Sequence, residues 1–248
     1  MAAIRAKDPE GHVALLDVAT TEPGSILGIA LLADSSPAST HDHRHGQRLV
    51  TASLSVQIRG DLAADPPARG HIDKRLGDWP FIAGSATIVG ASGADIASSY
   101  TTFVGLDPST RPSGQATGPA DGTIAMPRLD DLAGSIVEAI RAGRSAADED
   151  AVWSTLVLDR RLRNRFGVIH GASVYTVLAL LACEVPPPSV AVRILDSHVR
   201  FLRPITRESV TLEASVIARS RRFIDVDARI RAADEDLLAI GSFMLGST

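Results

Sequence analysis

The sequence has one cysteine, few aromatic residues and no excess of basic charge, and each scarcity excludes a class of protein. Cys183 alone cannot form an intrachain disulfide, which fits a reducing cytosol. The 25 basic residues are outnumbered by 29 acidic ones, so the net charge of −4 offers no basic surface for nucleic acid. With 4% aromatic but 45% hydrophobic residues, the core must be built mainly from Ala, Val, Leu and Ile.

Long apolar runs and targeting signals are also missing. No apolar run reaches the roughly 20 residues of a membrane-spanning helix, so no membrane span is predicted. The first ten residues are polar and show no signal peptide, and we expect a cytoplasmic protein. The 248 residues are enough for two domains of about 120.

The most apolar part of the chain is residues 163–184, RNRFGVIHGASVYTVLALLACE. From 172 to 183 no side chain carries a charge, so a helix here has no polar face. Such a helix must be buried on every side. Because about 13 residues are too few to cross a bilayer, we predict that a curved sheet wraps around this helix.

Four segments after this helix are predicted to be strands, because apolar and polar residues alternate in them and β-branched residues are frequent. They are VAVRILDSHVRFLRP, SVTLEASVIAR, RFIDVDARIRA and DLLAIGSFMLG. Two features are typical of a known family. The motif G-x-x-H-G-small at 167–172 opens the buried helix, and the first of the strands after it ends in FLRP. The C-terminal part of the chain is similar to hotdog-fold acyl-CoA thioesterases of the phenylacetate-pathway and 4-hydroxybenzoyl-CoA type. It departs from their H-G-G motif at Ala172.

The first half of the chain shows the same order of elements. Residues 11–33 read as helical from the spacing of their apolar residues, although Pro23 should kink or break the helix. Strands are predicted at about 48–58, 68–77, 82–90 and 94–106, separated by Gly and Pro. Since a helix and four strands recur with similar lengths, we interpret the chain as an internal repeat of about 120 residues.

The predicted fold is therefore an α+β double hotdog, with two central helices, near 11–22 and 171–184, each wrapped by an antiparallel sheet. The two sheets should join into one. The predicted domains are residues 1–106 and 127–248, joined by a linker at 107–126 that is rich in Pro, Gly, Ser and Thr. A helix at 127–144 and a strand at 152–158 precede the second central helix. The first repeat lacks that strand, so it is truncated or starts upstream of Met1.

The resemblance implies a catalytic carboxylate nine residues after the motif histidine, but that position is Ala179. The predicted helix of the first repeat, aligned on the second, has Asp17 at this position and Asp8-Pro9-Glu10 in place of the motif. One repeat thus has the motif without the carboxylate, and the other has the carboxylate without the motif. Because a hotdog pair builds each site from both helices, we predict one composite site and one acyl-CoA bound per chain.

The composite site would combine Asn164, His170 and Gly171 of the second repeat with Asp17 and Thr21 of the first. The amide of Gly171, at a helix N-terminus, can stabilise the oxyanion formed from a thioester. Asp17 would be nucleophile or general base, and Thr21, one helical turn later, would support it. The resemblance implies that Asn164 positions the carbonyl or water. Each residue also has a structural interpretation: an exposed acid, a packed histidine, a helix cap and a turn residue.

Two further groups of charged residues invite a binding role. The arginines Arg219, Arg221 and Arg222 could bind the phosphates of coenzyme A, or be solvated in a turn. The histidines at 41, 43 and 45 lie in a polar loop without a fourth spaced ligand, so no metal site is predicted. No cofactor is expected.

The function predicted from these residues is hydrolysis of an acyl-CoA or similar thioester. The alternative is a non-catalytic acyl-CoA-binding or scaffold protein of the same fold, favoured by Ala172, Ala179 and the missing motif of the first repeat. A hotdog enoyl-CoA hydratase is less favoured, because the Asp-x-Asn-Pro-x-His run of that family does not precede His170. Nucleic acid is not an expected partner, and a homo-oligomer of double-hotdog units is compatible with the pattern.

Overall fold

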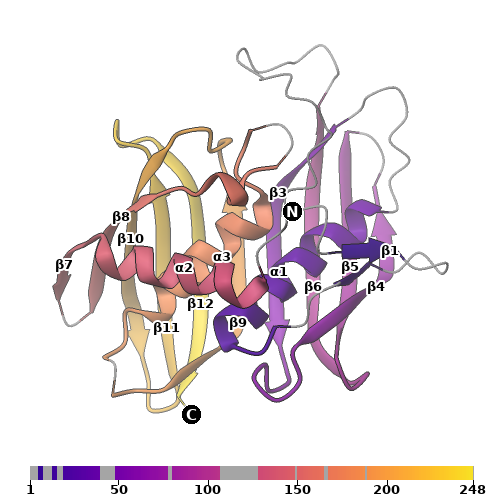
Figure 1. Cartoon of the computed structure of the whole chain (residues 1–248), viewed down its shortest axis with the longest axis horizontal. Coiled ribbons are helices and arrows are strands. Elements are labelled where there is room, and N and C mark those ends of the chain that lie inside the picture. The colour runs from indigo at the N-terminus through magenta and orange to yellow at the C-terminus, as the bar shows by residue number, and fades with distance from the viewer. Residues whose placement is uncertain are drawn as a thin grey trace.

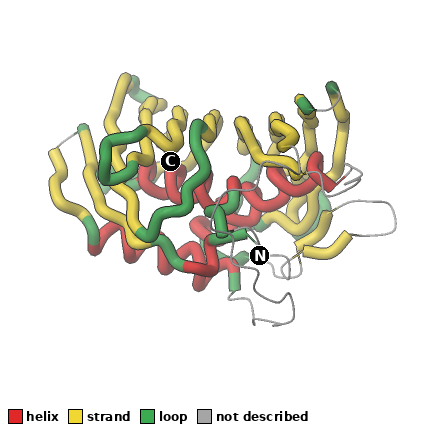
Figure 2. Tube along the Cα trace, turned by 90° about the horizontal axis from the view of Figure 1, so that it is seen from above, coloured by secondary structure: helices red, strands yellow, loops and turns green. Residues whose placement is uncertain are grey.

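The chain, described here by a computed structural model, forms one twelve-stranded sheet that curves around its helices (Figures 1 and 2). The structure describes residues 5–7, 13–15, 19–39, 48–77, 80–106, 128–148, 150–164, 167–187 and 189–247. The order of strands is β1-β2-β4-β5-β6-β3-β9-β12-β11-β10-β8-β7. Each pair of neighbours is antiparallel.

The central helix of the second half and the four strands after it are confirmed. The helix, α3 (Gly171–Cys183), is buried from Ala172 to Ala182. The strands that wrap it are β9 (Val192–Phe201), β10 (Ser209–Arg219), β11 (Phe223–Arg231) and β12 (Leu237–Ser247). Ahead of α3 come α2 (Leu129–Ala142), β7 (Arg144–Asp148), β8 (Ala151–Val157) and the short 3-10 helix η3 (Arg160–Leu162).

The four main strands of the first half are also confirmed. They are β3 (Arg48–Ile58), β4 (Pro67–Leu76), β5 (Phe81–Gly90) and β6 (Asp95–Leu106). Two short strands, β1 (Arg5–Lys7) and β2 (Val13–Leu15), precede them, and β2 pairs with β4. The expectation that the first half has no strand ahead of its helix is therefore wrong.

The prediction of a central helix near 11–22 is also wrong. The helix of the first half, α1, spans Glu22–Ser39, so of the range 11–33 that reads as helical, residues 13–15 form β2 and 22–33 are in the helix. Thr21 precedes its first residue, and the Thr21 hydroxyl accepts a hydrogen bond from the amide of Gly24 at 3.2 Å, as an N-cap does. Pro23 sits in the first turn, where the missing N–H costs nothing, so it marks a helix start rather than a kink.

The two halves meet along their central strands and helices. Strand β3 pairs with β9 over five residue pairs, from Ser53↔Arg200 to Gln57↔Asp196, which makes the two sheets continuous. Helix α1 contacts both α3 and α2, and the apolar residues of all three helices belong to one buried cluster. Figure 2 shows the helices lying along the concave side of the sheet. No helix in the described ranges has the length and apolar composition needed to span a bilayer.

Candidate active site

The entrance of α3 is the first component of the site. His170 is its N-cap: its Nδ1 accepts from the amide of Ala172 at 3.2 Å, and its carbonyl accepts from the amides of Ser173 and Val174 at 2.9 and 3.0 Å. The N–H groups of a first turn, together with the helix dipole, make a helix N-terminus attractive to negative charge. Gly171 is the first helical residue, so its amide is one of the donors at this end.

A carboxylate from the other half of the chain lies against this entrance. Asp34 is the only charged residue in the run 25–36 of α1, and it is 5% exposed. Its Oδ2 atom lies 3.2 Å from Nδ1 of His170, and its Oδ1 atom accepts a hydrogen bond of 2.5 Å from the hydroxyl of Thr51. A buried carboxylate is costly unless it is hydrogen-bonded, and both oxygens of Asp34 have partners.

Thr51 reaches Asp34 because of a β-bulge in β3. Leu54 and Val56 are fully buried on the side of β3 that faces the helices. Side chains alternate along a regular strand, so a residue three positions before Leu54 would point to the opposite side. The register of β3 against β6 shifts between Thr51 and Ser53, and this extra residue turns Thr51 toward α1.

The close approach of these groups requires a glycine at position 171. A Cβ atom built on Gly171 would lie 2.9 Å from Oγ1 of Thr51 and 3.2 Å from Oδ2 of Asp34. The backbone of Gly171 thus borders directly on the Asp34–Thr51 pair, and any side chain would fill the space between them. A buried carboxylate beside the first amide of a helix is the arrangement that carbonyl hydrolysis needs, since the carboxylate activates water and the amide stabilises the oxyanion.

The structure distributes the sequence-predicted site residues over several places. His170 and Gly171 lie at the entrance of α3, next to Asp34. Asp17 lies outside the described residues, as do the three histidines at 41, 43 and 45. Thr21 caps the opposite end of α1, about 20 Å from Asp34 at 1.5 Å per residue. The structure therefore does not bring Thr21 to Gly171.

Asn164 closes the turn before α3. Its amide nitrogen donates to the carbonyl of Val168 at 2.8 Å, and its side-chain Oδ1 accepts from the amide of Val168 at 3.3 Å. These contacts give Asn164 a role in the turn that leads to His170. A role toward a substrate carbonyl or water stays a prediction.

The three arginines lie at the far end of the strands from His170. The turn before His170 lies near the end of β9, because the amide of Ile169 donates to the carbonyl of Ile205 just beyond that strand. Arg222 lies near the start of β9, because its carbonyl accepts from the amide of Ser247, the residue that pairs with Val192. Ten residues of strand, about 33 Å, separate the two ends of β9. Arg219 forms an ion pair of 2.7 Å with Asp150. A role of Arg219, Arg221 and Arg222 toward coenzyme A stays a prediction.

Sequence analysis missed Asp34 and Thr51. The signal for Asp34 was present, because a single acid in an otherwise apolar buried helix must have partners that satisfy it. Nothing local singles out Thr51, since several threonines occur in the strands and the bulge decides which side it faces. Within the described ranges, no group of three His, Cys, Asp or Glu side chains is arranged to hold a metal ion.

The entrance of α1 occupies the corresponding place on the other side of the helix pair, but its chemistry differs. The amides and hydroxyls of Thr20 and Thr21 donate to the carboxylate of Asp130, on α2, at 2.6–3.1 Å. Burial raises the pKa of Asp130, but these hydrogen bonds outweigh it and lower the pKa to about 2. Pro23 has no N–H to offer. A fixed negative charge thus already occupies this helix N-terminus.

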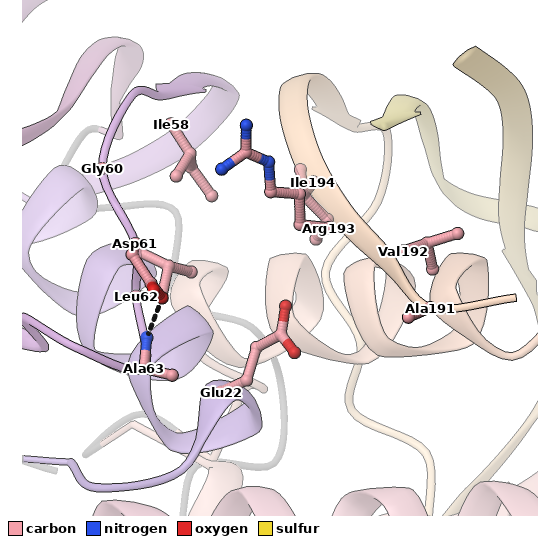
Figure 3. Close-up of a pocket in the computed structure, with 10 residues that line it drawn as sticks. All are labelled: Glu22, Ile58, Gly60, Asp61, Leu62, Ala63, Ala191, Val192, Arg193 and Ile194. Carbon is pink, nitrogen blue, oxygen red and sulfur yellow. Dashed lines mark hydrogen bonds between the residues drawn. The ribbon is translucent and has the colours of Figure 1, made fainter. Parts of the chain in front are cut away.

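A cavity of about 200 Å³ opens beside this second entrance (Figure 3). It is lined by Glu22, by Ile58 and Gly60–Ala63 after β3, and by residues 191–194 at the start of β9. Strand β9 has a register shift against β12 directly after Ile194, just as β3 has one against β6 directly after Thr51. At this second entrance the apolar side chain of Ile194 therefore takes the position that the Thr51 hydroxyl has at the first. Burial and the Asp61 carboxylate raise the pKa of Glu22.

Known proteins share this architecture. Residues 166–239 match the sequence profile of the family described as Thioesterase superfamily. Among solved structures, the tesB protein of Mycobacterium avium subspecies paratuberculosis matches with a TM-score of 0.67 at 12% identity, covering 100% of this chain and 97% of that one. Acyl-CoA thioesterase II TesB2 from Mycobacterium marinum matches with a TM-score of 0.59 at 14% identity, covering 98% and 94%. A search of curated protein sequences finds no match. The two structural likenesses show that the fold is the double hotdog.

Proposed function

We propose that this chain hydrolyses acyl-CoA thioesters at one composite site between its halves. Its residues 166–239 match the thioesterase superfamily, and its fold is like that of the TesB proteins. The observation that carries the proposal is the position of Asp34 of α1 at the N-terminus of α3, where its carboxylate lies 3.2 Å from His170. Neither half has this pair of groups alone. The cytoplasmic location expected from the single cysteine stays a prediction.

In the proposed reaction, Asp34 acts as general base. Both of its oxygens are held, one by Thr51 and one facing His170, so the carboxylate is fixed in orientation and takes a proton from water. The water oxygen attacks the thioester carbonyl carbon, and the amide of Gly171 donates to the resulting oxyanion. The intermediate then expels the thiolate of coenzyme A, which takes the proton from Asp34. The products are a carboxylic acid and free coenzyme A.

The substitution Asp34→Asn tests this assignment. A carboxamide keeps the shape of the side chain but is a poor base, so we expect kcat to fall by about 10²–10⁴-fold. A matched control is Asp73→Asn, because Asp73 also accepts a threonine hydroxyl, that of Thr87 at 3.0 Å, but at an exposed site on β4. Turnover should be followed by release of free thiol, with short, long and aromatic acyl-CoA substrates.

Two outcomes would contradict the proposal in different ways. Equal turnover by wild type and Asp34→Asn would remove Asp34 from the mechanism. Absence of turnover by the wild-type protein with every substrate, together with tight binding of a non-hydrolysable acyl-CoA analogue, would favour the non-catalytic acyl-CoA-binding alternative.

The proposal also includes a single site per chain. At the second entrance Asp130 occupies the helix N-terminus, Pro23 lacks a donor and Ile194 replaces the threonine. The negative charges of Asp130 and Glu22 would also repel an oxyanion and the phosphates of coenzyme A. Titration calorimetry with a non-hydrolysable acyl-CoA analogue should therefore give one molecule bound per chain. Two equivalent sites would contradict the composite-site argument even if the enzyme is active.

A further inference from the structure

Two groups of the chain compete for one nitrogen of His170. Nδ1 lies 3.2 Å from Oδ2 of Asp34 and 3.2 Å from the amide nitrogen of Ala172. A ring nitrogen that carries a proton can donate to the carboxylate but cannot accept from the amide, and a bare nitrogen does the reverse. The position of one proton therefore decides whether His170 serves the helix or the carboxylate.

The contact with Asp34 identifies the state. Without a proton between them, Nδ1 and Oδ2 would present lone pairs to each other at 3.2 Å, in a place where Asp34 is only 5% exposed. Such repulsion is poorly screened away from water. A proton between the two atoms removes the repulsion and gives a charge-assisted hydrogen bond. Because an imidazole binds a proton more strongly than a carboxylate does in water, the proton belongs on Nδ1.

We propose that His170 is a positioning residue, which donates from Nδ1 to Oδ2 of Asp34 and holds that carboxylate for catalysis. The inference rests on the proposed function in so far as Asp34 is the general base. Thr51 holds Oδ1 from β3, and His170 holds Oδ2 from the entrance of α3, so two hydrogen bonds fix the plane of the carboxylate. His170 thus acts through Asp34 and needs no contact with the substrate.

Variants at position 170 can separate this role from capping of α3. Asparagine can place an N–H near the position of Nδ1 and still offers an oxygen to the helix amides. Aspartate is as good a cap as asparagine, but it has no donor and would put a second carboxylate opposite Asp34. Alanine offers neither. Wild-type activity in His170→Asp would therefore show that His170 serves only as a helix cap.

The experiment combines kinetics with nitrogen NMR of the full-length protein labelled with ¹⁵N-histidine. We expect the His170 signal, assigned by its loss in His170→Asn, to show a protonated Nδ1. We expect kcat to fall about 100-fold in His170→Asp and His170→Ala, with KM little changed, and to recover to within about tenfold of wild type in His170→Asn. Thermal unfolding should show His170→Asp folded at the assay temperature.

A bare Nδ1 in the wild-type spectrum would overturn the inference, because the proton would then not lie toward Asp34. Wild-type kcat in a folded His170→Asp would overturn it as well, and would leave His170 a helix cap. The NMR result needs no substrate, so it is obtained even if the wild-type protein hydrolyses no thioester. Failure of the proposed function and failure of this inference are therefore distinguishable.

Discussion

Replacing Gly171 with alanine adds one methyl group at the point where the two halves of the site meet. The new Cβ would lie 2.9 Å from Oγ1 of Thr51 and 3.2 Å from Oδ2 of Asp34. The first distance is shorter than real Cβ contacts, so Thr51 or the backbone must move by a few tenths of an ångström. Thr51 cannot yield freely, because its hydroxyl is held by Asp34 at 2.5 Å. The methyl also takes up space beside the amide that would bind the oxyanion.

The expected loss is in catalysis rather than in folding. Misplacing a catalytic group by a fraction of its contact distance typically costs about 100-fold in rate, which corresponds to about 2.7 kcal/mol of transition-state stabilisation. Alanine is favoured over glycine within a helix by about 0.5–1 kcal/mol, and this gain offsets part of the crowding. Gly171 is not among the glycines with positive φ, so the change adds no backbone strain. We expect the melting temperature to change by no more than about 4 °C.

The control for this substitution is Gly134→Ala in α2. A Cβ at Gly134 would meet nothing within 4 Å, so this change tests glycine-to-alanine replacement in a helix without crowding. It should leave kcat/KM unchanged and raise stability by about 0.5–1 kcal/mol. The assay is thiol release from an acyl-CoA on which the wild-type protein is active. A Gly171→Ala enzyme within about threefold of wild type, or about 0.7 kcal/mol, would refute the close approach of substrate to this backbone.

Three further predictions concern groups away from this contact. The pKa of Asp130 is lowered to about 2, so its hydrogen bonds to Thr20 and Thr21 stabilise the fold above the unfolded pKa of about 4 and are lost as pH falls through about 2. Asp130→Asn should therefore melt below wild type at pH 7, with the gap closing toward pH 2; a constant gap would contradict this. Tyr175→Phe removes a buried hydrogen bond of 2.6 Å to Ser197, so urea unfolding should show a free energy of unfolding lower by about 1 kcal/mol. The control Tyr100→Phe, at an exposed residue, should leave the free energy of unfolding unchanged. Burial and the carboxylates of Glu22 and Glu184 raise the pKa of Cys183 to about 12. Thiol reagents should therefore modify the native protein slowly near neutral pH, and rapid labelling would contradict this prediction.

The amino-acid pattern alone was enough to predict most elements of this fold, although β1, β2 and β7 were missed. Helix α3 was predicted at 171–184 and spans Gly171–Cys183, because an uncharged run of this length can only be a buried helix. The four strands after the central helix in each half fell within three residues of their predicted bounds, because β-branched alternation and Gly-Pro punctuation are local signals. The boundary of α1 was misplaced where two local signals conflicted: Pro23 reads as a kink within a helix and as a start after the cap Thr21.

Which residues share the site was decided only by the tertiary structure. The sequence contained both a helix entrance without a carboxylate and, in α1, a carboxylate alone in an apolar run, but their meeting depends on how α1 packs against α3. That packing is set by the pairing of β3 with β9, about 145 residues apart in the chain. The bulge that turns Thr51 toward Asp34 is likewise a property of paired strands, since a single strand has no register to shift. Local periodicity specifies helices and strands, whereas contacts between distant residues arise only when the sheet closes around both helices.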